Sequence, residues 1–225
     1  MKYLIFGKKG QLGKAFVKEL NRQGRDTSAF DVDELDIGNL SDVLSVFEQL
    51  KPFAVINCAA YNYVDLAEEN FSLAYRVNSL AVKNLAFASK KYNSFLVHYG
   101  SDYIFDGQKT DGLYMEDDPV RPLNEYGKSK YLGEFLLKEE IEKYLILRLS
   151  WVFGEGEQNF IHKLLKWSEQ SKSLNIACDE VSVPTYTETI VSVTLKALSH
   201  ELTGTYHLTN SGYASRYEWA RFIMK

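Results

Sequence analysis

"KYLIFGKKGQLGKAF", residues 2–16, is the stretch that decides the fold of this chain. It begins with a short apolar run, which is typical of a buried strand, and Gly7, Gly10 and Gly13 follow directly. From Leu12 onward, apolar residues recur at helical spacing. Glycine permits a tight turn and a close approach to the backbone, and the first N–H groups of a helix can bind a pyrophosphate. The stretch therefore predicts a strand, a dinucleotide-binding turn and a helix; ordinary loop glycines are the alternative.

The same alternation of apolar runs and helical periods continues along the chain. Further strands are expected at 26–30, 53–60, 95–101, 144–150 and 204–209. Helices are expected at 12–24, 40–51, 72–92 and 187–202, and another carries residues 124–134. Repeated strand–helix units predict an α/β protein with a Rossmann-like, doubly wound parallel sheet covered on both faces. Right-handed crossovers place the carboxyl ends of the strands at one edge, where ligands bind in such sheets.

The pattern loosens after Gly154. Residues 159–177 read as a helix followed by a short strand, whereas the helix and strand of about 187–210 read as a return to the core. We therefore predict a dinucleotide-binding domain at 1–154 and a smaller substrate lobe at 155–225, interleaved with that returning segment. The chain ends inside an amphipathic pattern without a C-cap, so we expect the lobe to be incomplete and a C-terminal segment to be missing.

Composition excludes several classes of function. Of the 225 residues, 45% are hydrophobic and 25% charged, and the net charge is −4 with no basic stripe, which argues against a nucleic-acid partner. No apolar run is long enough to predict a membrane span or a signal peptide. The only cysteines, Cys58 and Cys178, are far apart, and the four histidines lack metal-ligand spacing, so neither a disulfide framework nor a metal site is predicted. A reducing cytoplasm is the expected compartment.

Two acidic positions are candidates for cofactor contacts. Asp31 ends the second strand, where a carboxylate can accept a hydrogen bond from a ribose 2′-hydroxyl and repel a 2′-phosphate. No arginine follows it closely, which favours NADH over NADPH. A solvated turn residue is an equally good interpretation of Asp31. Asp36 and Ile37 lie where a loop can flank an adenine, or where a turn caps a helix.

Ser101 and Asp102 end the strand expected at 95–101. At the ligand edge of the sheet a hydroxyl can donate to a carbonyl oxygen, and a carboxylate can orient a substrate hydroxyl. On its own, however, a Ser-Asp pair at the end of a strand is a common turn. The pair therefore gains meaning only together with another group that acts on a carbonyl.

The stretch "NEYGKSKYLGE", residues 124–134, supplies such a group. Tyr126 and Lys130 lie four residues apart and so share one helix face. A phenol has a pKa of about 10, and a neighbouring ammonium is expected to lower it. Tyr126 can then donate a proton to a carbonyl oxygen while hydride arrives at its carbon. Ordinary helix surface is the alternative, but the glycine turn and Ser101 favour the catalytic interpretation.

In these motifs the chain resembles the dTDP-4-dehydrorhamnose reductases, a branch of the extended short-chain dehydrogenase/reductases. The matching segments are residues 6–13, 57–69, 100–107, 122–134, 147–154 and 204–212. The resemblance implies hydride transfer from NADH or NADPH to C4 of a dTDP-4-keto-6-deoxy sugar, which yields dTDP-L-rhamnose or a close relative. It also implies a homodimer, because some members form dimers bridged by Mg²⁺ through glutamates.

The resemblance assigns roles to individual residues. Tyr126 would be the proton donor and Lys130 its partner; Ser101 would replace the usual threonine at the keto oxygen, with Asp102 beside it. The implied substrate contacts are Val64, Tyr103, Trp151, Asn159 and Phe160. The predicted cofactor contacts are Gly7, Gly10, Gln11, Leu12, Gly13, Asp31, Asp36, Ile37, Ala59, Ala60, Tyr61 and Asn78.

Two other functions remain open. A nucleotide-sugar epimerase or dehydratase would share the fold, but dehydratases usually carry an Asp-Glu pair after the strand-end hydroxyl, and here Tyr103 follows Asp102. A non-catalytic binding subunit, like the regulatory subunit of methionine adenosyltransferase, would resemble the same family. Such a subunit is expected to lose the Ser-Tyr-Lys set, which is intact here.

Overall fold

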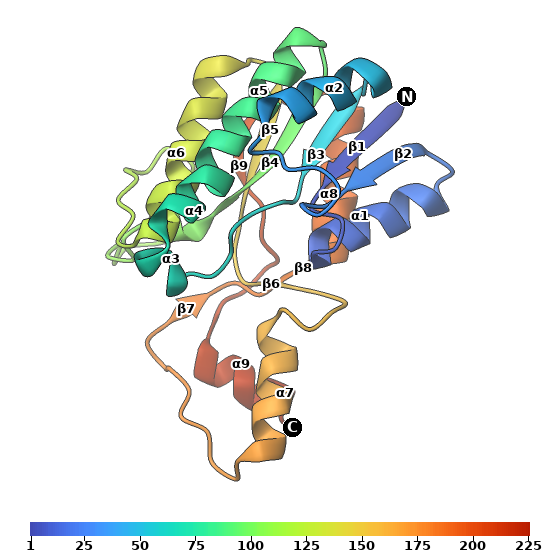
Figure 1. The fold of residues 1–225 in the computed structure, drawn as a ribbon. Coiled ribbons are helices and arrows are strands. Elements are labelled where there is room, and N and C mark those ends of the chain that lie inside the picture. The colour runs from blue at the N-terminus through green and yellow to red at the C-terminus, as the bar shows by residue number, and fades with distance from the viewer.

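The computed structural model describes residues 1–225 and is built around a six-stranded sheet (Figure 1). In spatial order, its strands are β2 (Asp26–Phe30), β1 (Lys2–Phe6), β3 (Ala54–Asn57), β4 (Phe95–Ser101), β5 (Tyr144–Leu149) and β9 (Gly204–His207). All neighbouring pairs run parallel. From β1 the chain passes first to β2 on one side and then to β3 on the other. This reversal creates a switch point between β1 and β3, at which the carboxyl edge of such a sheet can bind a ligand.

Helices cover both faces of the sheet. They are α1 (Gln11–Arg22) and α8 (Thr187–Ser199) on one face, and α2 (Leu40–Leu50), α5 (Ala81–Lys91) and α6 (Glu125–Glu140) on the other. Phe16 and Ile190 are fully buried in the first layer, and Phe47, Leu85 and Leu137 in the second. An apolar layer on each face of the sheet explains why the central strands are continuous hydrophobic runs, since both of their faces are buried. The predicted doubly wound α/β fold is confirmed.

The helix expected at 72–92 is divided. It consists of α4 (Phe71–Tyr75), a π-helical turn η1 (Arg76–Leu80), and α5, and the short helix α3 (Leu66–Glu69) precedes it. At the π turn, α6 comes so close that a Cβ on Gly133 would lie 2.0 Å from the Asn78 carbonyl oxygen. Ser79 also donates to the Ser129 carbonyl of α6 at 2.7 Å. Helical periodicity does not reveal this turn, because it coincides with contacts to a helix distant in the sequence.

The remaining elements form a smaller lobe. They are β6 (Val152–Phe153), α7 (Phe160–Gln170), β7 (Val181–Ser182), β8 (Thr185–Tyr186), β10 (Ala214–Ser215) and α9 (Arg216–Ile223). β6 pairs with β8, and β7 pairs with β10. In Figure 1, α7 and α9 lie side by side at the end of the molecule away from the sheet. The short strand expected before residue 177 is wrong: it lies at β7, where β10 supplies the pairing partner.

β9 and α8 return from the lobe to the sheet. β9 pairs with β5 as the last strand, and α8 packs beside α1. None of the helices is long and apolar enough to cross a membrane. A 3₁₀ turn, η2 (Asp102–Ile104), follows β4 and begins the loop that leads toward α6. The carboxyl edge of the sheet therefore faces the lobe, with β4, α6 and the turn after β1 nearby.

Candidate active site

The glycine turn after β1 is packed so tightly that it requires glycine at two positions. Gly7 has a φ of +80°, and a Cβ there would lie 2.6 Å from the Ala59 backbone nitrogen. A Cβ on Gly13 would lie 2.0 Å from the Gly7 carbonyl oxygen. The turn thus touches both α1 and the loop after β3, which contains Ala59 and Ala60. These contacts bring the predicted cofactor residues of the two segments together.

The amino terminus of α1 is open toward a ligand. Gly10 is its N-cap and contributes no side-chain cap, and the first turn has no acidic residue. A Cβ on Gly10 would meet only the Gly7 carbonyl oxygen, at 3.4 Å. The N–H groups of Gln11 and Leu12 therefore begin a helix whose dipole favours an anion. These residues fit the pyrophosphate of a dinucleotide.

Asp31 lies beside this turn, at the end of β2. Its carboxylate accepts a hydrogen bond from the Lys9 backbone nitrogen at 2.8 Å. The side chains of Lys8 and Lys9 pair with Glu34 and Asp33 at 2.7 and 2.6 Å. A pair of lysine side chains, each bound to a carboxylate, therefore borders the position predicted for the adenosine ribose. The residues after β2 do not predict this pair, because its signal in the sequence is the two lysines inside the glycine turn.

Asp36 and Ile37 form a turn that the π-helical segment holds. Asp36 accepts from the Gly38 backbone nitrogen at 2.8 Å and pairs with Arg76 of η1. Ile37 is buried, and its carbonyl accepts from Asn84 at 3.0 Å. The turn is thus fixed in place on the α5 side of the sheet, and both of the alternatives for these two residues stay predictions.

Asn78 connects the loop after β3 to α6. Its side-chain oxygen accepts from the Tyr61 backbone nitrogen at 2.8 Å, and its nitrogen donates to the Tyr61 carbonyl at 3.0 Å. The same nitrogen lies 3.0 Å from the Ser129 hydroxyl, which stands one residue before Lys130. A single buried amide therefore ties a predicted cofactor loop to the helix that carries Tyr126.

Helix α6 positions Tyr126 and Lys130 at the carboxyl edge. Asn124 caps the helix by accepting from the Gly127 nitrogen at 2.7 Å. Tyr126 is buried and packs edge-to-face on Tyr103, with ring centroids 5.5 Å apart. Val64 and Tyr61 pack against the same small cluster. Lys130 is also buried, and its Nζ donates to the Tyr99 carbonyl at 2.6 Å.

The expected effect of Lys130 on Tyr126 is corrected by the structure. Burial raises the pKa of Tyr126 well above its ordinary value, and only a hydrogen bond with Ser101 acts in the opposite direction. Burial also lowers the pKa of Lys130 to about 8. The ammonium group donates to a backbone carbonyl, and desolvation outweighs any charge effect on the phenol. Tyr126 is consequently fully protonated near neutral pH, which is the form that a proton donor needs.

Asp102 has a partner that the sequence did not predict. Its carboxylate accepts from the Ser182 hydroxyl of β7 at 2.8 Å, and Ser182 contacts the Ser150 hydroxyl in turn. Ser101 accepts from the Tyr103 backbone nitrogen at 3.2 Å and so starts the 3₁₀ turn. The substrate lobe therefore reaches the end of β4 through a chain of hydroxyl groups.

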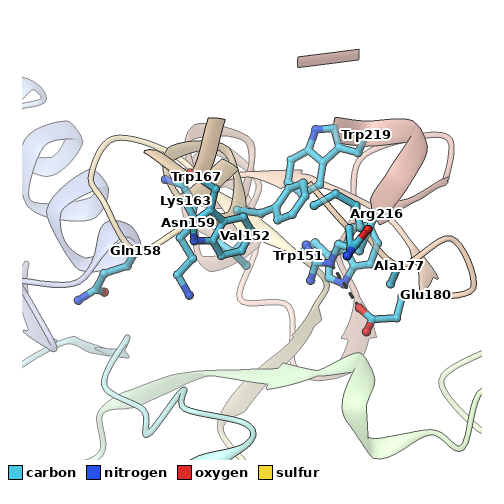
Figure 2. Close-up of a pocket in the computed structure, with 13 residues that line it drawn as sticks. Trp151, Val152, Gln158, Asn159, Lys163, Trp167, Ala177, Glu180, Arg216 and Trp219 are labelled. Atoms are coloured by element: carbon cyan, nitrogen blue, oxygen red, sulfur yellow. Dashed lines mark ion pairs between the residues drawn. The ribbon is translucent and has the colours of Figure 1, made fainter. Parts of the chain in front are cut away.

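A cavity of about 410 Å³ opens in the lobe, and Trp151, two residues after the end of β5, is part of its lining (Figure 2). Its aromatic lining residues are Trp151, Phe160, Trp167 and Trp219. Its charged lining residues are Lys163, Glu180 and Arg216. Trp151 has a φ of +36°, a backbone conformation that costs free energy in a non-glycine residue and that clusters at functional sites. The lining residues come from separate segments of the chain, so no sequence motif predicts the cavity.

Asn159, a predicted substrate residue, also lines the cavity, but both polar atoms of its side chain already form hydrogen bonds within the protein. The oxygen caps α7 by accepting from the His162 nitrogen at 3.0 Å. The nitrogen donates to the Gln11 side chain at 3.0 Å and to the Gly154 and Gly156 carbonyls. Asn159 thus joins the lobe to the glycine turn, while Phe160 and Trp151 present their rings to the cavity.

A dinucleotide turn, a strand-end hydroxyl and a Tyr–Lys helix meet at one sheet edge, as in oxidoreductases of the short-chain dehydrogenase/reductase class. A family model described as the RmlD substrate binding domain matches residues 1–225. The dTDP-4-dehydrorhamnose reductase of Aggregatibacter actinomycetemcomitans is 41% identical over 96% of this chain and 76% of its own. The chain belongs to the dTDP-4-dehydrorhamnose reductase family.

Two further proteins show how wide the likeness is. The spore coat polysaccharide biosynthesis protein SpsK of Bacillus subtilis is 36% identical over 100% of this chain and 78% of its own. The dTDP-4-dehydrorhamnose reductase of Bacillus anthracis, solved in complex with NADP, superimposes with a TM-score of 0.95. It is 37% identical, and the match covers 99% of this chain and 79% of that one.

Proposed function

We propose that this protein reduces the C4 keto group of dTDP-4-dehydrorhamnose and so forms dTDP-L-rhamnose. The observation that carries the proposal is Tyr126, held protonated and buried beside Ser101 at the carboxyl edge of a dinucleotide-binding sheet. Relatives that bear the name of this reductase, 41% and 35% identical over 96% and 100% of the chain, support the choice of substrate.

The side chains at the sheet edge fit a carbonyl reduction. A bound nicotinamide cofactor supplies the hydride that C4 receives. The Tyr126 hydroxyl gives its proton to the keto oxygen, so the carbonyl becomes a secondary alcohol and the charge on oxygen never builds up fully. Ser101 donates a hydrogen bond to the same oxygen, and the buried Lys130, one helical turn after Tyr126, donates to the Tyr99 carbonyl. Asp102, oriented by Ser182, would hold a neighbouring sugar hydroxyl.

The cavity beside the site suits the rest of the substrate. Its volume lies within the range of pockets that hold small ligands. The aromatic side chains of Phe160, Trp167 and Trp219 line the cavity and would contact a flat base, while Val64 and Tyr103 pack near Tyr126 and would contact the sugar. Asn159 would act mainly by holding Phe160 at the start of α7.

A nicotinamide dinucleotide is the cofactor that the turn after β1 fits, and Gly7, Gly10 and Gly13 would hold its pyrophosphate. Asp31 remains the basis for the predicted preference for NADH, because its carboxylate borders the ribose position. Lys8 and Lys9 would let a 2′-phosphate bind as well, since their ion pairs are exposed and therefore weak. The Bacillus anthracis relative, solved with NADP, supports use of the phosphorylated cofactor.

Further features of the proposal concern the whole protein. We assign dinucleotide binding to residues 1–154 together with α8 and β9, and substrate binding to the rest of 155–225. A homodimer, Mg²⁺ at its interface and a cytoplasmic location stay predictions that rest on family resemblance and composition. Within residues 1–225, no three His, Cys, Asp or Glu side chains gather in a way that could hold a metal ion.

The test of this function is an assay with defined sugars. The purified protein is mixed with NADH or NADPH and a panel of dTDP-4-keto-6-deoxy sugars, and nicotinamide absorbance is followed. We expect turnover with dTDP-4-dehydrorhamnose, and a loss of about 10²- to 10⁴-fold in kcat for Tyr126→Phe with cofactor affinity within about twofold. Tyr144→Phe, which removes a hydroxyl at the opposite end of the sheet, is the matched control. Cofactor binding without oxidation by any sugar would show that the proposal is wrong.

A further inference from the structure

Arg216 lies in the cavity in an unusual setting. It is the first residue of α9, directly after the N-cap Ser215, which forms a capping box with Glu218. Its guanidinium carbon lies 3.5 Å from the ring centroid of Trp151 and 5.0 Å from that of Phe160. Figure 2 shows the two side chains stacked, with Arg216 over Trp151. Stacking of this kind fixes the plane of the guanidinium group and leaves its N–H edge free to bind.

The positive charge of Arg216 is poorly compensated within the chain. Its one ion pair is with Glu180, whose carboxylate oxygen lies 3.6 Å from Nε, beyond hydrogen-bond distance (dashed line, Figure 2). The Glu180 side chain is 60% exposed, whereas that of Arg216 is only 20% exposed. Burial lowers the pKa of Arg216, but a guanidinium stays charged at neutral pH. A half-buried cation with five donors and one distant, solvated partner is a site for an anion.

The position of Arg216 indicates which anion it binds. On one side are the aromatic rings of the cavity; on the other its charge reaches Asp102 and Tyr103, next to Tyr126. A nucleotide sugar joins its base to its sugar through a diphosphate. With the base against the aromatic rings and the sugar at Tyr126, the diphosphate must pass Arg216.

We propose that Arg216 binds the diphosphate of the nucleotide sugar, and that the substrate displaces Glu180 from it. This inference rests on the proposed function, and it names a binding residue for that substrate. The planar guanidinium can form two parallel hydrogen bonds to phosphate oxygens, and Trp151 holds it in the plane that this requires. The exchange is favourable because the long, exposed ion pair with Glu180 contributes little free energy, whereas a bidentate contact between the guanidinium and a phosphate contributes more.

The experiment measures binding rather than turnover. Wild-type protein, Arg216→Gln, Arg216→Lys and Arg221→Gln are titrated calorimetrically with dTDP, with UDP and with thymidine. Arg221 lies on the same helix, so its variant has the same change in net charge. We expect Arg216→Gln to raise the Kd for dTDP and for UDP about tenfold or more, and the Kd for thymidine less than about threefold. The Kd values of Arg216→Lys should lie between those of the wild type and Arg216→Gln. Arg221→Gln should bind all three ligands like wild type.

Two results would overturn the inference. Unchanged dTDP and UDP binding by Arg216→Gln would show that the guanidinium does not touch the diphosphate. An equal loss for thymidine and dTDP would show that Arg216 merely supports the aromatic wall. The reductase assay separates this inference from the proposed function: diphosphate binding that depends on Arg216, without turnover of any dTDP-4-keto sugar, rejects the function alone. If the wild type turns over the substrate and Arg216→Gln binds dTDP as tightly as the wild type, only the diphosphate-binding role of Arg216 is rejected.

Discussion

At the scale of the residue, burial dominates the two groups predicted to move the proton. Tyr126 and Lys130 are only 8% and 3% exposed, so desolvation favours the neutral form of each. The Tyr126 phenol therefore carries its proton, and the lysine has a pKa of about 8. The hydrogen bond from Lys130 to the Tyr99 carbonyl satisfies one ammonium donor, which makes the buried amine tolerable.

The lowered pKa of Lys130 predicts a dependence of stability on pH. Between pH 8 and about 10.5 the unfolded chain still binds this proton and the folded chain does not, so the free energy of unfolding rises with pH in that window. Compared with Lys130→Met, the wild type should therefore gain at most about 3 kcal/mol from pH 7 to 10.5. Urea denaturation at intervals of one pH unit measures the difference.

Lys128 provides the matched control for that series. It lies on the same helix but is exposed, and its hydrogen bond with Glu125 raises its pKa. The wild type should therefore show no gain above pH 8 relative to Lys128→Met, which keeps Lys130. If the wild type and Lys130→Met instead give parallel curves between pH 7 and 10.5, Lys130 keeps its ordinary pKa in the folded protein.

At the scale of the element, the three glycines of the turn have different tasks. Gly7 and Gly13 have no space for a Cβ, because backbone atoms lie within 2.8 Å of its position. Gly10 has an ordinary φ of −71° and space around it. The first two glycines are thus required by the fold itself, whereas Gly10 leaves room at the helix amino terminus that a ligand can use.

Gly10→Ala should therefore separate binding from folding. We expect the free energy of unfolding to change by less than about 1 kcal/mol, and the Kd for NADPH to rise at least about tenfold because a methyl group obstructs the pyrophosphate. Fluorescence titration measures the affinity. Gly24→Asn is the control: φ there is +65°, which Asn tolerates, and nothing lies within 4 Å. Wild-type affinity in Gly10→Ala would place the pyrophosphate elsewhere.

The strands and helices could largely be predicted because each is specified locally. The expected bounds of β1 and β2 agree with the structure, since short apolar or mixed runs end at glycine and turn residues. The π turn η1 could not be predicted, because it arises where α6 packs against Asn78. The strand β7 was misplaced for a similar reason: two residues form a strand only when β10 lies beside them.

At the scale of the whole molecule, a few polar contacts join the lobe to the sheet. Asn159 reaches Gln11 at the glycine turn, and Ser182 reaches Asp102 at the end of β4. An exposed ion pair, Lys18 with Glu155, spans the same boundary. These two part-buried contacts should hold the cofactor and substrate regions in register, whereas solvent and salt screen the exposed pair.

Asn159→Ser tests this arrangement. Serine keeps an acceptor for the cap of α7 but cannot donate to Gln11 and the two glycine carbonyls together. We expect the free energy of unfolding to fall by about 1–3 kcal/mol because buried acceptors lose their donor. Lys18→Ala, which breaks the exposed pair, should leave the denaturation midpoint essentially unchanged. Equal effects of the two substitutions would contradict a buried connection.

The sequence by itself determined the order of the strands and helices that build the six-stranded sheet, the glycine turn, and the face that Tyr126 shares with Lys130. These features depend on neighbours a few residues away, so periodicity and spacing specify them. Only the tertiary structure decided the rest. It placed Ser182 on Asp102 and Arg216 on Trp151, and it reversed the expected pKa shift of Tyr126. Burial and contacts between distant segments set these properties, and both exist only once the chain has folded.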